Sequence, residues 1–92
     1  MVEVVMSSLF KRQKKRLTKK QIKRLDNEIR KIVDDPTIGT LKRGDLKGVY
    51  VQKFKVDVDQ FLLAYEFDKE TRYLIMIGFH ENFYRNLKRY RN

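Results

Sequence analysis

The chain has 92 residues, of which 41% are hydrophobic, with four glycines and one proline, so it should fold as a single domain over residues 1–92 rather than stay disordered. It has no cysteine and one histidine, which excludes disulfides and thiolate metal sites and argues against a structural metal. Its 22 Lys or Arg against 12 Asp or Glu give a formal net charge of +10, which indicates a polyanionic partner such as nucleic acid or an acidic protein.

The N-terminus predicts a strand and then a short helix. Residues 2–6 are apolar and β-branched, as is typical of a strand. This apolar stretch is too short for a signal peptide or a membrane span, so we expect a cytoplasmic protein. Leu9, Phe10 and Leu17 then stand out from the basic run 11–16, which predicts a helix with a narrow apolar stripe and a wide charged face.

A second helix is expected from residue 18. Thr18 followed three residues later by Gln21 has the pattern of a capping box, in which both side chains satisfy free N–H groups at a helix start. Four apolar residues follow at helical spacing: Ile22, Leu25, Ile29 and Ile32. We expect all four to enter the core, and the proline at position 36 to end the helix near residue 33.

The second half of the chain predicts a loop, three strands and a last helix. Three glycines mark residues 37–48 as a loop without apolar periodicity. Residues 49–56, 61–68 and 72–78 are rich in β-branched and aromatic residues and are joined by short polar turns, so they should form an antiparallel meander. Residues 81–91 have apolar side chains at helical spacing and predict a short C-terminal helix lying on the sheet.

Together these elements predict an α+β fold, with an N-terminal strand and a two-helix hairpin packed on an antiparallel meander that ends in a short helix. We expect the helices to cover one face of the sheet and to leave the other face open. The alternation along residues 50–56 places Tyr50 and Phe54 on one side and Lys53 and Lys55 on the other. Both lysines should therefore point from a rigid strand onto the open face.

Three segments share motifs with one known family. Residues 41–50 read LKRGDLKGVY, residues 61–67 read FLLAYEF, and residues 77–84 read IGFHENFY. They resemble, in turn, the loop-to-strand signature, the central strand and the end of the last strand in the RelE/ParE superfamily of toxins from type II toxin–antitoxin systems. The resemblance covers most of residues 37–90 and implies the RelE-like fold.

The resemblance also implies an activity. RelE-like and YafQ-like members are metal-free endoribonucleases that cleave mRNA, typically in the ribosomal A site, inhibit translation, and are neutralised by an antitoxin from the same operon. The ribose 2'-OH attacks the adjacent phosphate and leaves a cyclic phosphate. Such a reaction needs groups that move protons and cations that offset the charge of the transition state. The implied partners are the cognate antitoxin, mRNA and the ribosome, with no cofactor and no membrane.

Four residues match catalytic positions of these ribonucleases: His80, Tyr84, Lys53 and Lys55. His80 follows a strand-end glycine, and an imidazole can give or take a proton near neutral pH. Lys53 and Lys55 are expected to stabilise the phosphate, although they would also suit a merely solvated strand face. Tyr84 is expected to stack on a base, unless its ring packs into the core.

One departure from the family pattern is the central strand, where many RelE toxins have an arginine and this chain has Leu62. The additional histidine and aspartate of the YafQ-like site are also missing near Val56 and Gln60. Cations of the C-terminal helix are candidates to compensate and to bind RNA: Arg85, Lys88 and Arg89.

A second group of cations is expected to bind ribosomal RNA. Residues 11–31 hold eleven Lys or Arg against two acidic residues. Nonspecific phosphate contacts from such a surface weaken steeply with salt. The candidates are Lys11, Arg12, Lys14, Lys15, Arg16, Lys19, Lys20 and Lys23.

Two other functions stay open. The ParE branch of the superfamily shares the fold but inhibits DNA gyrase by binding, without ribonuclease residues. An inactive RNA-binding homologue is also compatible with Leu62. The combination of His80 and Tyr84 favours the ribonuclease.

Overall fold

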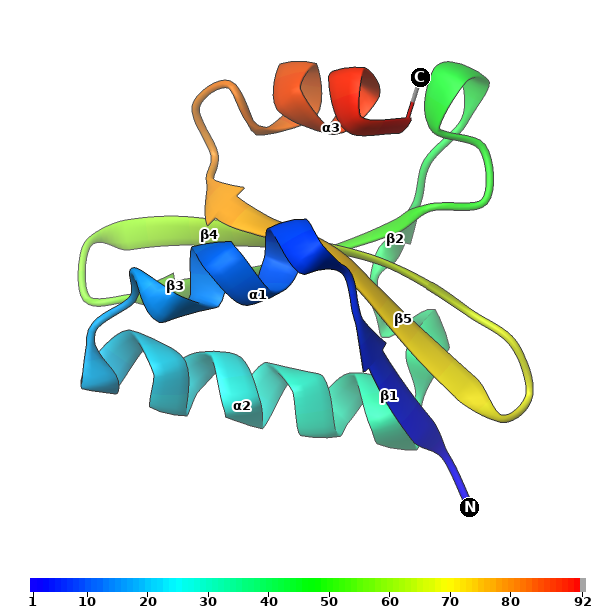
Figure 1. Ribbon diagram of the computed structural model, residues 1–92, viewed down its shortest axis with the longest axis horizontal. Coiled ribbons are helices and arrows are strands. Elements are labelled where there is room, and N and C mark those ends of the chain that lie inside the picture. The colour runs from blue at the N-terminus through cyan, green and yellow to red at the C-terminus, as the bar shows by residue number, and fades with distance from the viewer. Residues whose placement is uncertain (92) are drawn as a thin grey trace.

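The computed structural model describes residues 1–91 and has a five-stranded sheet with helices on both faces (Figure 1). The elements are β1 (Glu3–Met6), α1 (Ser8–Lys15), α2 (Lys19–Asp34), the 3-10 turn η1 (Pro36–Ile38), β2 (Thr40–Leu41), the 3-10 turn η2 (Gly44–Leu46), β3 (Tyr50–Val56), β4 (Asp59–Phe67), β5 (Thr71–Phe79) and α3 (Phe83–Arg91). The strand order is β1-β5-β4-β3-β2. The predicted α+β class, hairpin and meander are confirmed. Within residues 1–91, no helix has the length and hydrophobicity needed to cross a bilayer.

The helix starts follow the local sequence. Thr18 and Gln21 form the predicted capping box: the Gln21 N–H donates to the Thr18 hydroxyl at 3.2 Å and the Thr18 N–H donates to the Gln21 side chain at 2.8 Å. Ser7 caps α1 by accepting from the Phe10 N–H at 2.9 Å. Such caps stabilise a helix by about 1 kcal/mol each because they satisfy donors that have no partner within the helix.

The N-terminal strand pairs in parallel with β5, from Glu3 beside Thr71 to Met6 beside Leu74. This pairing was not predicted, because it joins the two ends of the chain. Beyond Met6, α1 replaces the strand along the edge of β5. The Gln13 side chain accepts from the Ile77 N–H at 2.9 Å, so this edge has a partner although the strand has ended.

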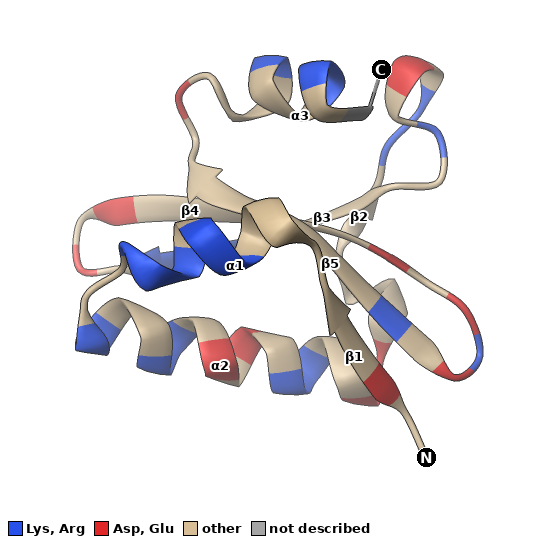
Figure 2. Ribbon diagram, viewed as in Figure 1, with Lys and Arg blue, Asp and Glu red and all other residues tan. Residues whose placement is uncertain are grey.

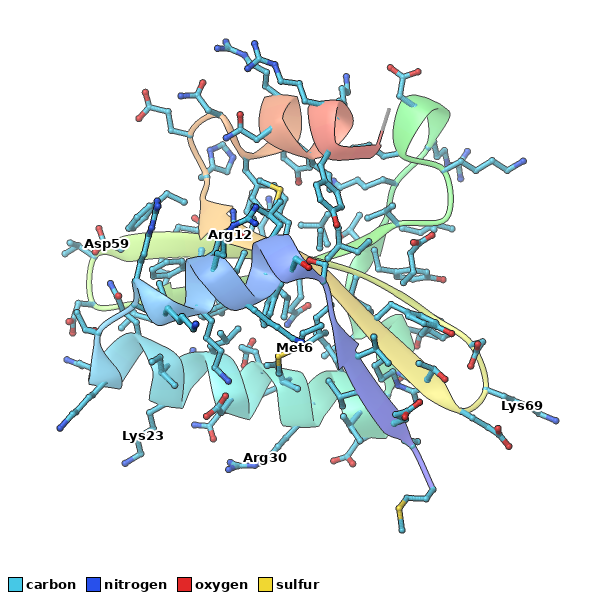
Figure 3. The ribbon with its side chains drawn as sticks, viewed as in Figure 1. Met6, Arg12, Lys23, Arg30, Asp59 and Lys69 are labelled. Atoms are coloured by element: carbon cyan, nitrogen blue, oxygen red, sulfur yellow. The ribbon has the colours of Figure 1, made fainter. Side chains whose placement is uncertain are left out.

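The first core lies between the sheet and the helices α1 and α2. Leu25, Ile29 and Ile32 pack against aromatic residues of β3 and β4, as predicted. Ile22 was expected in the same core, but it is only partly buried and lines a hollow between α1 and α2 together with Met6, which lies between these elements in Figure 3. That expectation is wrong because Ile22 lies on the side of α2 that faces α1 rather than the sheet.

The second face of the sheet is covered, so the expectation of an open face is wrong. In Figure 1, α3 lies on the opposite side of the sheet from α2. This face forms a core of its own: Leu46, Val49, Val51, Leu62, Ala64, Ile75, Met76, Phe83 and Leu87. The physical reason is that every residue from 61 to 65 is apolar and buried. Such a continuous run in a central strand needs a cover on both faces.

Two boundaries also differ from prediction. The loop 37–48 contains the short strand β2, in which Thr40 pairs with Val51 and Leu41 with Tyr50. The strand β4 begins at Asp59 rather than at residue 61, because Asp57 adopts a left-handed φ of 56° and closes a two-residue turn. Neither β2 nor the earlier start of β4 has an alternation of apolar residues from which the sequence could have predicted it.

Tyr65 connects the segment that follows α2 to the sheet through two hydrogen bonds. Its buried hydroxyl donates to the Pro36 carbonyl at 2.7 Å and accepts from the Gly39 N–H at 3.1 Å. Burial raises the pKa of the Tyr65 phenol above its ordinary value. The stability that the neutral phenol contributes is therefore fully present below the pKa of an unfolded tyrosine, about 10, and is lost as pH rises through the higher folded value.

Replacing Tyr65 with Phe should lower the free energy of unfolding at neutral pH by about 1–3 kcal/mol, because the two backbone groups lose their partner. It should also reduce the loss of stability between pH 9 and 11. Urea unfolding over this pH range measures both effects. Tyr90, which is 48% exposed, provides the control as Tyr90→Phe. If Tyr65→Phe lost as much stability between pH 9 and 11 as the wild type, this would contradict the role given to the Tyr65 phenol.

Candidate nucleic-acid interface

The strand register aligns the candidate residues on the face that α3 covers. Lys53 pairs with Leu62, and Leu62 pairs with Gly78 on the next strand, so these three positions form one row across the sheet. Lys55 pairs with Gln60, and the His80 N–H donates to the Gln60 carbonyl at 3.3 Å, which extends the neighbouring row beyond the end of β5. Adjacent strands lie about 4.8 Å apart, so the lysines lie about 10 Å from the Gly78–His80 segment.

Lys53 and Lys55 are both exposed, as the alternation of β3 predicts. Val51 on the same side of the strand is buried under α3. The two lysines therefore lie at the uncovered end of this face, beside the helix rather than beneath it. A cationic strand face of this kind can hold a phosphate with little rearrangement.

His80 is exposed and lies in the connection between β5 and α3. Asn82 adopts a left-handed φ of 63° and turns the chain back, and the Phe83 N–H donates to the His80 carbonyl at 3.3 Å. A Cβ added at Gly78 would lie 3.5 Å from the Phe83 ring, an ordinary contact distance, so α3 packs close to the strand end without requiring a glycine there. The position of His80 is thus set by the backbone on both sides.

Tyr84 lies in the first turn of α3 and is partly buried at the margin of the second core. Its ring meets Phe83 edge-on, with ring centroids 5.5 Å apart. The Lys42 Nζ atom lies 4.9 Å from the centroid of the Tyr84 ring. Tyr84 therefore combines the two alternatives predicted from the sequence. Part of its side chain packs against the core, and the rest is accessible to a ligand. The sequence analysis did not single out Lys42, whose position depends on the pairing of β2 with β3.

Leu62, the residue at which the sequence departs from the pattern of the resembled family, is fully buried beneath α3. An arginine here would leave a charge in an apolar core. Leu62→Arg should therefore lower the free energy of unfolding by about 3 kcal/mol or more. Denaturant unfolding measures this effect, with Lys53→Arg in the same row as the exposed control. Equal stability of the two variants would mean that α3 moves aside easily.

The cations expected to compensate lie on the outer side of α3. Arg85, Lys88 and Arg89 are exposed, whereas Phe83 and Leu87 point into the core. Arg12 of α1 lies closer to the end of β5 than these cations do (Figure 3). Leu9 packs against the second core, and Arg12 follows Leu9 by one turn on the same side of α1. Arg12 is exposed and makes no ion pair with any residue that the structure describes.

The basic surface of α1 and α2 is only partly free to bind. Lys14 pairs with Asp26 at 3.4 Å and Lys20 with Asp57 at 2.6 Å, so the structure engages two of the expected cations with acids. The other expected cations are exposed and have no ion pair within residues 1–91: Lys11, Arg12, Lys15, Arg16, Lys19 and Lys23. Figure 2 shows lysines and arginines spread over α1, α2 and α3.

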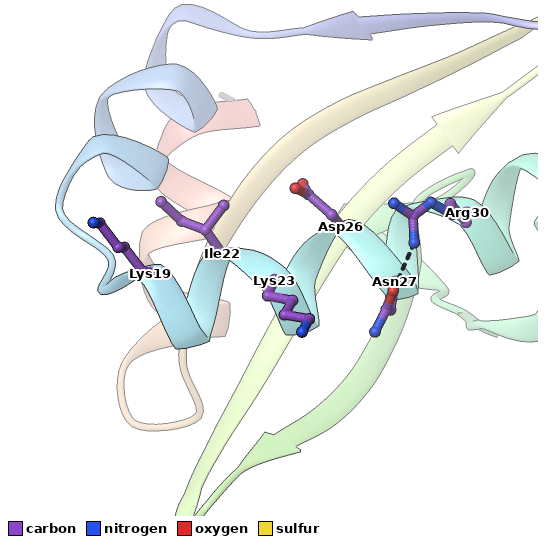
Figure 4. A pocket seen from close by; sticks show the side chains of 6 residues that line it. All are labelled: Lys19, Ile22, Lys23, Asp26, Asn27 and Arg30. Atoms are coloured by element: carbon purple, nitrogen blue, oxygen red, sulfur yellow. Dashed lines mark hydrogen bonds between the residues drawn. The ribbon is translucent and has the colours of Figure 1, made fainter.

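A shallow hollow follows the outer side of α2 (Figure 4). Lys19, Lys23 and Arg30 line it, and the Arg30 guanidinium donates to the Asn27 side chain at 2.7 Å. Figure 3 shows Lys23 and Arg30 directed away from the sheet. This hollow and the row with His80 belong to different surfaces, so the structure does not bring all expected site residues together.

The family and fold of the chain emerge from comparisons with known proteins. A model of the ParE-like toxin of type II bacterial toxin–antitoxin systems matches residues 4–88. A mutant of E. coli toxin RelE in the free state superposes with a TM-score of 0.72 at 16% identity, covering 95% of this chain and 92% of RelE.

Two further solved structures agree. The intact E. coli RelBE toxin–antitoxin complex contains a chain with a TM-score of 0.68 at 16% identity, covering 85% of this chain and 95% of that one. The YoeB/ParE toxin from Agrobacterium tumefaciens gives 0.65 at 15% identity, covering 86% and 99%. No curated protein sequence matches the chain significantly. At such low identities, the structures establish the shared fold.

Proposed function

The chain belongs to the ParE-like toxins of type II toxin–antitoxin systems, and we propose that it acts as a metal-independent endoribonuclease that cleaves mRNA on the ribosome. The observation that carries this proposal is the register on the α3 face. This register aligns the chain segment that contains the exposed His80 with two exposed lysines, Lys53 and Lys55, on a neighbouring part of the same sheet face.

The proposed reaction needs only groups of these types. The ribose 2'-OH attacks the adjacent phosphorus, the bond from phosphorus to the 5' oxygen breaks, and the products are a 2',3'-cyclic phosphate and a 5'-OH. His80 carries one of the two proton transfers, from the 2'-OH or to the leaving oxygen. Lys53 and Lys55 offset the charge that grows on the phosphate. Tyr84 stacks on a base beside the scissile bond.

The proposed partners follow from charge. An antitoxin should be acidic where it covers these cations, and the toxin–antitoxin complex of E. coli RelBE supports a protein partner of this kind. The free cations on α1 and α2 are proposed to contact phosphates of ribosomal RNA. This proposal implies that the toxin acts in the cytoplasm. These contacts should weaken with increasing salt.

The experiment that tests this function is cell-free translation with the purified chain, in which mRNA ends are mapped by primer extension with and without ribosomes. We expect new ends with the wild type, fewer ends with Lys53→Ala combined with Lys55→Ala, and unchanged cleavage with Lys69→Ala. Lys69 is an exposed lysine in the β4–β5 turn, distant from the row (Figure 3). Intact mRNA in every lane would overturn the ribonuclease.

Two observations support a second candidate, a gyrase inhibitor. The family model is described as ParE-like, and Leu62 packs into the core where many ribonucleases of the superfamily have arginine. Intact mRNA together with loss of gyrase supercoiling activity would establish this candidate. Intact mRNA with unaffected supercoiling would leave the inactive RNA-binding homologue.

A further inference from the structure

The backbone carbonyl of Lys55 has a partner from α2. The His80 N–H donates to the Gln60 carbonyl, so the backbone groups of Gln60 point toward β5. Lys55 and Gln60 therefore form a non-hydrogen-bonded pair, and the backbone groups of Lys55 point away from β4 toward the edge of the sheet. At this edge β2 pairs with the first two residues of β3 and does not reach Lys55. The partner is Arg24 of α2, whose Nε–H donates to the Lys55 carbonyl at 3.3 Å.

Arg24 reaches this carbonyl along the ring of Phe54. The guanidinium carbon lies 6.0 Å from the ring centroid of Phe54, which belongs to the first core. A planar guanidinium with five donors can lie against an aromatic ring and still donate hydrogen bonds. Arg24 therefore links the face of the sheet that α2 covers to the backbone of Lys55, whose side chain belongs to the other face.

Glu28 holds the guanidinium of Arg24 in place. Glu28 lies one turn after Arg24 on α2 and is 2% exposed, and its Oε2 atom lies 3.8 Å from Arg24 Nη1. The same oxygen lies 2.8 Å from Lys31 Nζ, and Gln52 Nε2 donates to Glu28 Oε1 at 3.2 Å. Gln52 belongs to the same strand as Lys55. One buried carboxylate is thus connected to β3 directly through Gln52 and indirectly through Arg24.

A buried carboxylate of this kind is better suited to fixing a geometry than to stabilising the fold. Taking it out of water costs free energy that its ion pairs repay only in part, and apolar residues in the same place are often at least as stabilising. The ion pair is therefore weak evidence of a contribution to stability. It does fix the direction of the Arg24 guanidinium, and through it the end of β3 that carries Lys55.

The turn beyond Lys55 has a second contact with α2. The carboxylate of Asp57, in the turn between β3 and β4, accepts from Lys20 Nζ at 2.6 Å. Both of these side chains are more than half exposed, and exposed ion pairs contribute little. The hydrogen bond from Arg24 is therefore the firmer of these two contacts between α2 and the end of the hairpin.

We propose that Arg24 is a positioning residue for Lys55 in the proposed cleavage reaction. Its hydrogen bond fixes the backbone of Lys55, so that the ammonium group of Lys55 is held toward the phosphate of the scissile bond. Arg24 acts through Lys55 and needs no contact of its own with the RNA. The inference rests on the proposed function and deepens it, because it assigns the residue on which the geometry of a cation of the site depends. A displacement of about 1 Å at a reacting group can cost about 100-fold in rate.

The first measurement is single-turnover cleavage of ribosome-bound mRNA by Arg24→Met, alone and combined with Lys55→Ala. Arg24→Met should lower the rate roughly 10-fold in the wild-type background and less than about 2-fold in the Lys55→Ala background. The second effect is small because the group that Arg24 positions is then absent. Equal losses of rate in the two backgrounds would overturn the inference.

Tyr65→Phe is the matched control for an effect on stability alone. It also removes a side-chain hydrogen bond to a backbone carbonyl, that of Pro36. Tyr65 pairs with Tyr50, at the opposite end of β3 from Lys55, so the rate of cleavage by folded Tyr65→Phe should stay close to that of the wild type. A loss of rate as large as that of Arg24→Met would mean that both variants act through stability, and the positioning role would be wrong.

A second measurement tests the geometry without RNA. NMR of the isotope-labelled full chain should show a coupling through the hydrogen bond between Arg24 Nε and the carbonyl carbon of Lys55. Arg24→Met should increase the backbone motion of Lys55 and leave that of Tyr50 unchanged. Unchanged motion of Lys55 would overturn the positioning role, whatever the chain does to mRNA. If the wild type cleaves no mRNA, the ribonuclease proposal fails, whereas the NMR measurement still decides whether Arg24 holds Lys55.

Discussion

His80→Ala is expected to reduce the rate of mRNA cleavage by a factor of about 100 or more, because a positioned general acid or base contributes about that much to catalysis. The fold should stay intact, because His80 is exposed and its hydrogen bonds within residues 1–91 come from its backbone. Single-turnover cleavage of ribosome-bound mRNA between pH 6 and 9 measures the effect.

Glu81→Ala is the matched control, since Glu81 is the exposed neighbour in the same connection and no role is proposed for it. Its rate should stay close to that of the wild type. His80→Ala and Glu81→Ala with equal, nearly wild-type rates would exclude His80 from proton transfer. Lys53 and Lys55 would then contribute only to the binding of RNA.

A large effect on stability is expected for Arg72→Met. Arg72 is 5% exposed, and its guanidinium donates to the carbonyls of Ile32 at 3.1 Å, Val33 at 3.0 Å and Asp68 at 2.9 Å. It thereby satisfies the C-terminus of α2 and joins it to the β4–β5 hairpin. Removing the charge leaves these acceptors without this donor, and the free energy of unfolding should fall by about 3 kcal/mol or more.

Denaturant unfolding measures this difference, with Arg30→Met as the comparison. Arg30 is exposed on α2 and its side chain donates a hydrogen bond to Asn27, so its replacement should change the free energy of unfolding by less than about 0.5 kcal/mol. Similar stability of the two variants would mean that water replaces the Arg72 guanidinium at the helix end. It would remove Arg72 as the link between α2 and the hairpin.

The sequence predicted most of the elements because their signals are local. The capping box at Thr18 and Gln21 and the apolar spacing of α2 depend on residues within two turns of each other. The parallel pairing of Glu3 with Thr71 has no local signal, since it joins segments 68 residues apart in sequence. The packing of α3 on the second face of the sheet was not predicted, because the apolar run 61–65 does not itself show which element covers each face. The stripe of Phe83 and Leu87 on α3 is the signal that would have indicated it.

For the candidate site, the sequence predicted the exposure of Lys53 and Lys55 from alternation alone. It could not predict that Lys42 reaches the ring of Tyr84, because this contact needs both the pairing of β2 and the position of α3. The ion pair between Lys20 and Asp57 also escaped prediction. Its partners come from a helix and a turn 37 residues apart in sequence.

The most direct test of the central claim is the chemistry of the RNA ends. Mass spectrometry of fragments from ribosome-bound mRNA should find a 2',3'-cyclic phosphate on one fragment and a 5'-OH on the other, and a single 2'-deoxy nucleotide at the cleaved position should abolish cleavage. Fragments with 3'-OH and 5'-phosphate ends, or cleavage that persists with the 2'-deoxy nucleotide, would contradict attack by the 2'-OH and with it the proposed mechanism.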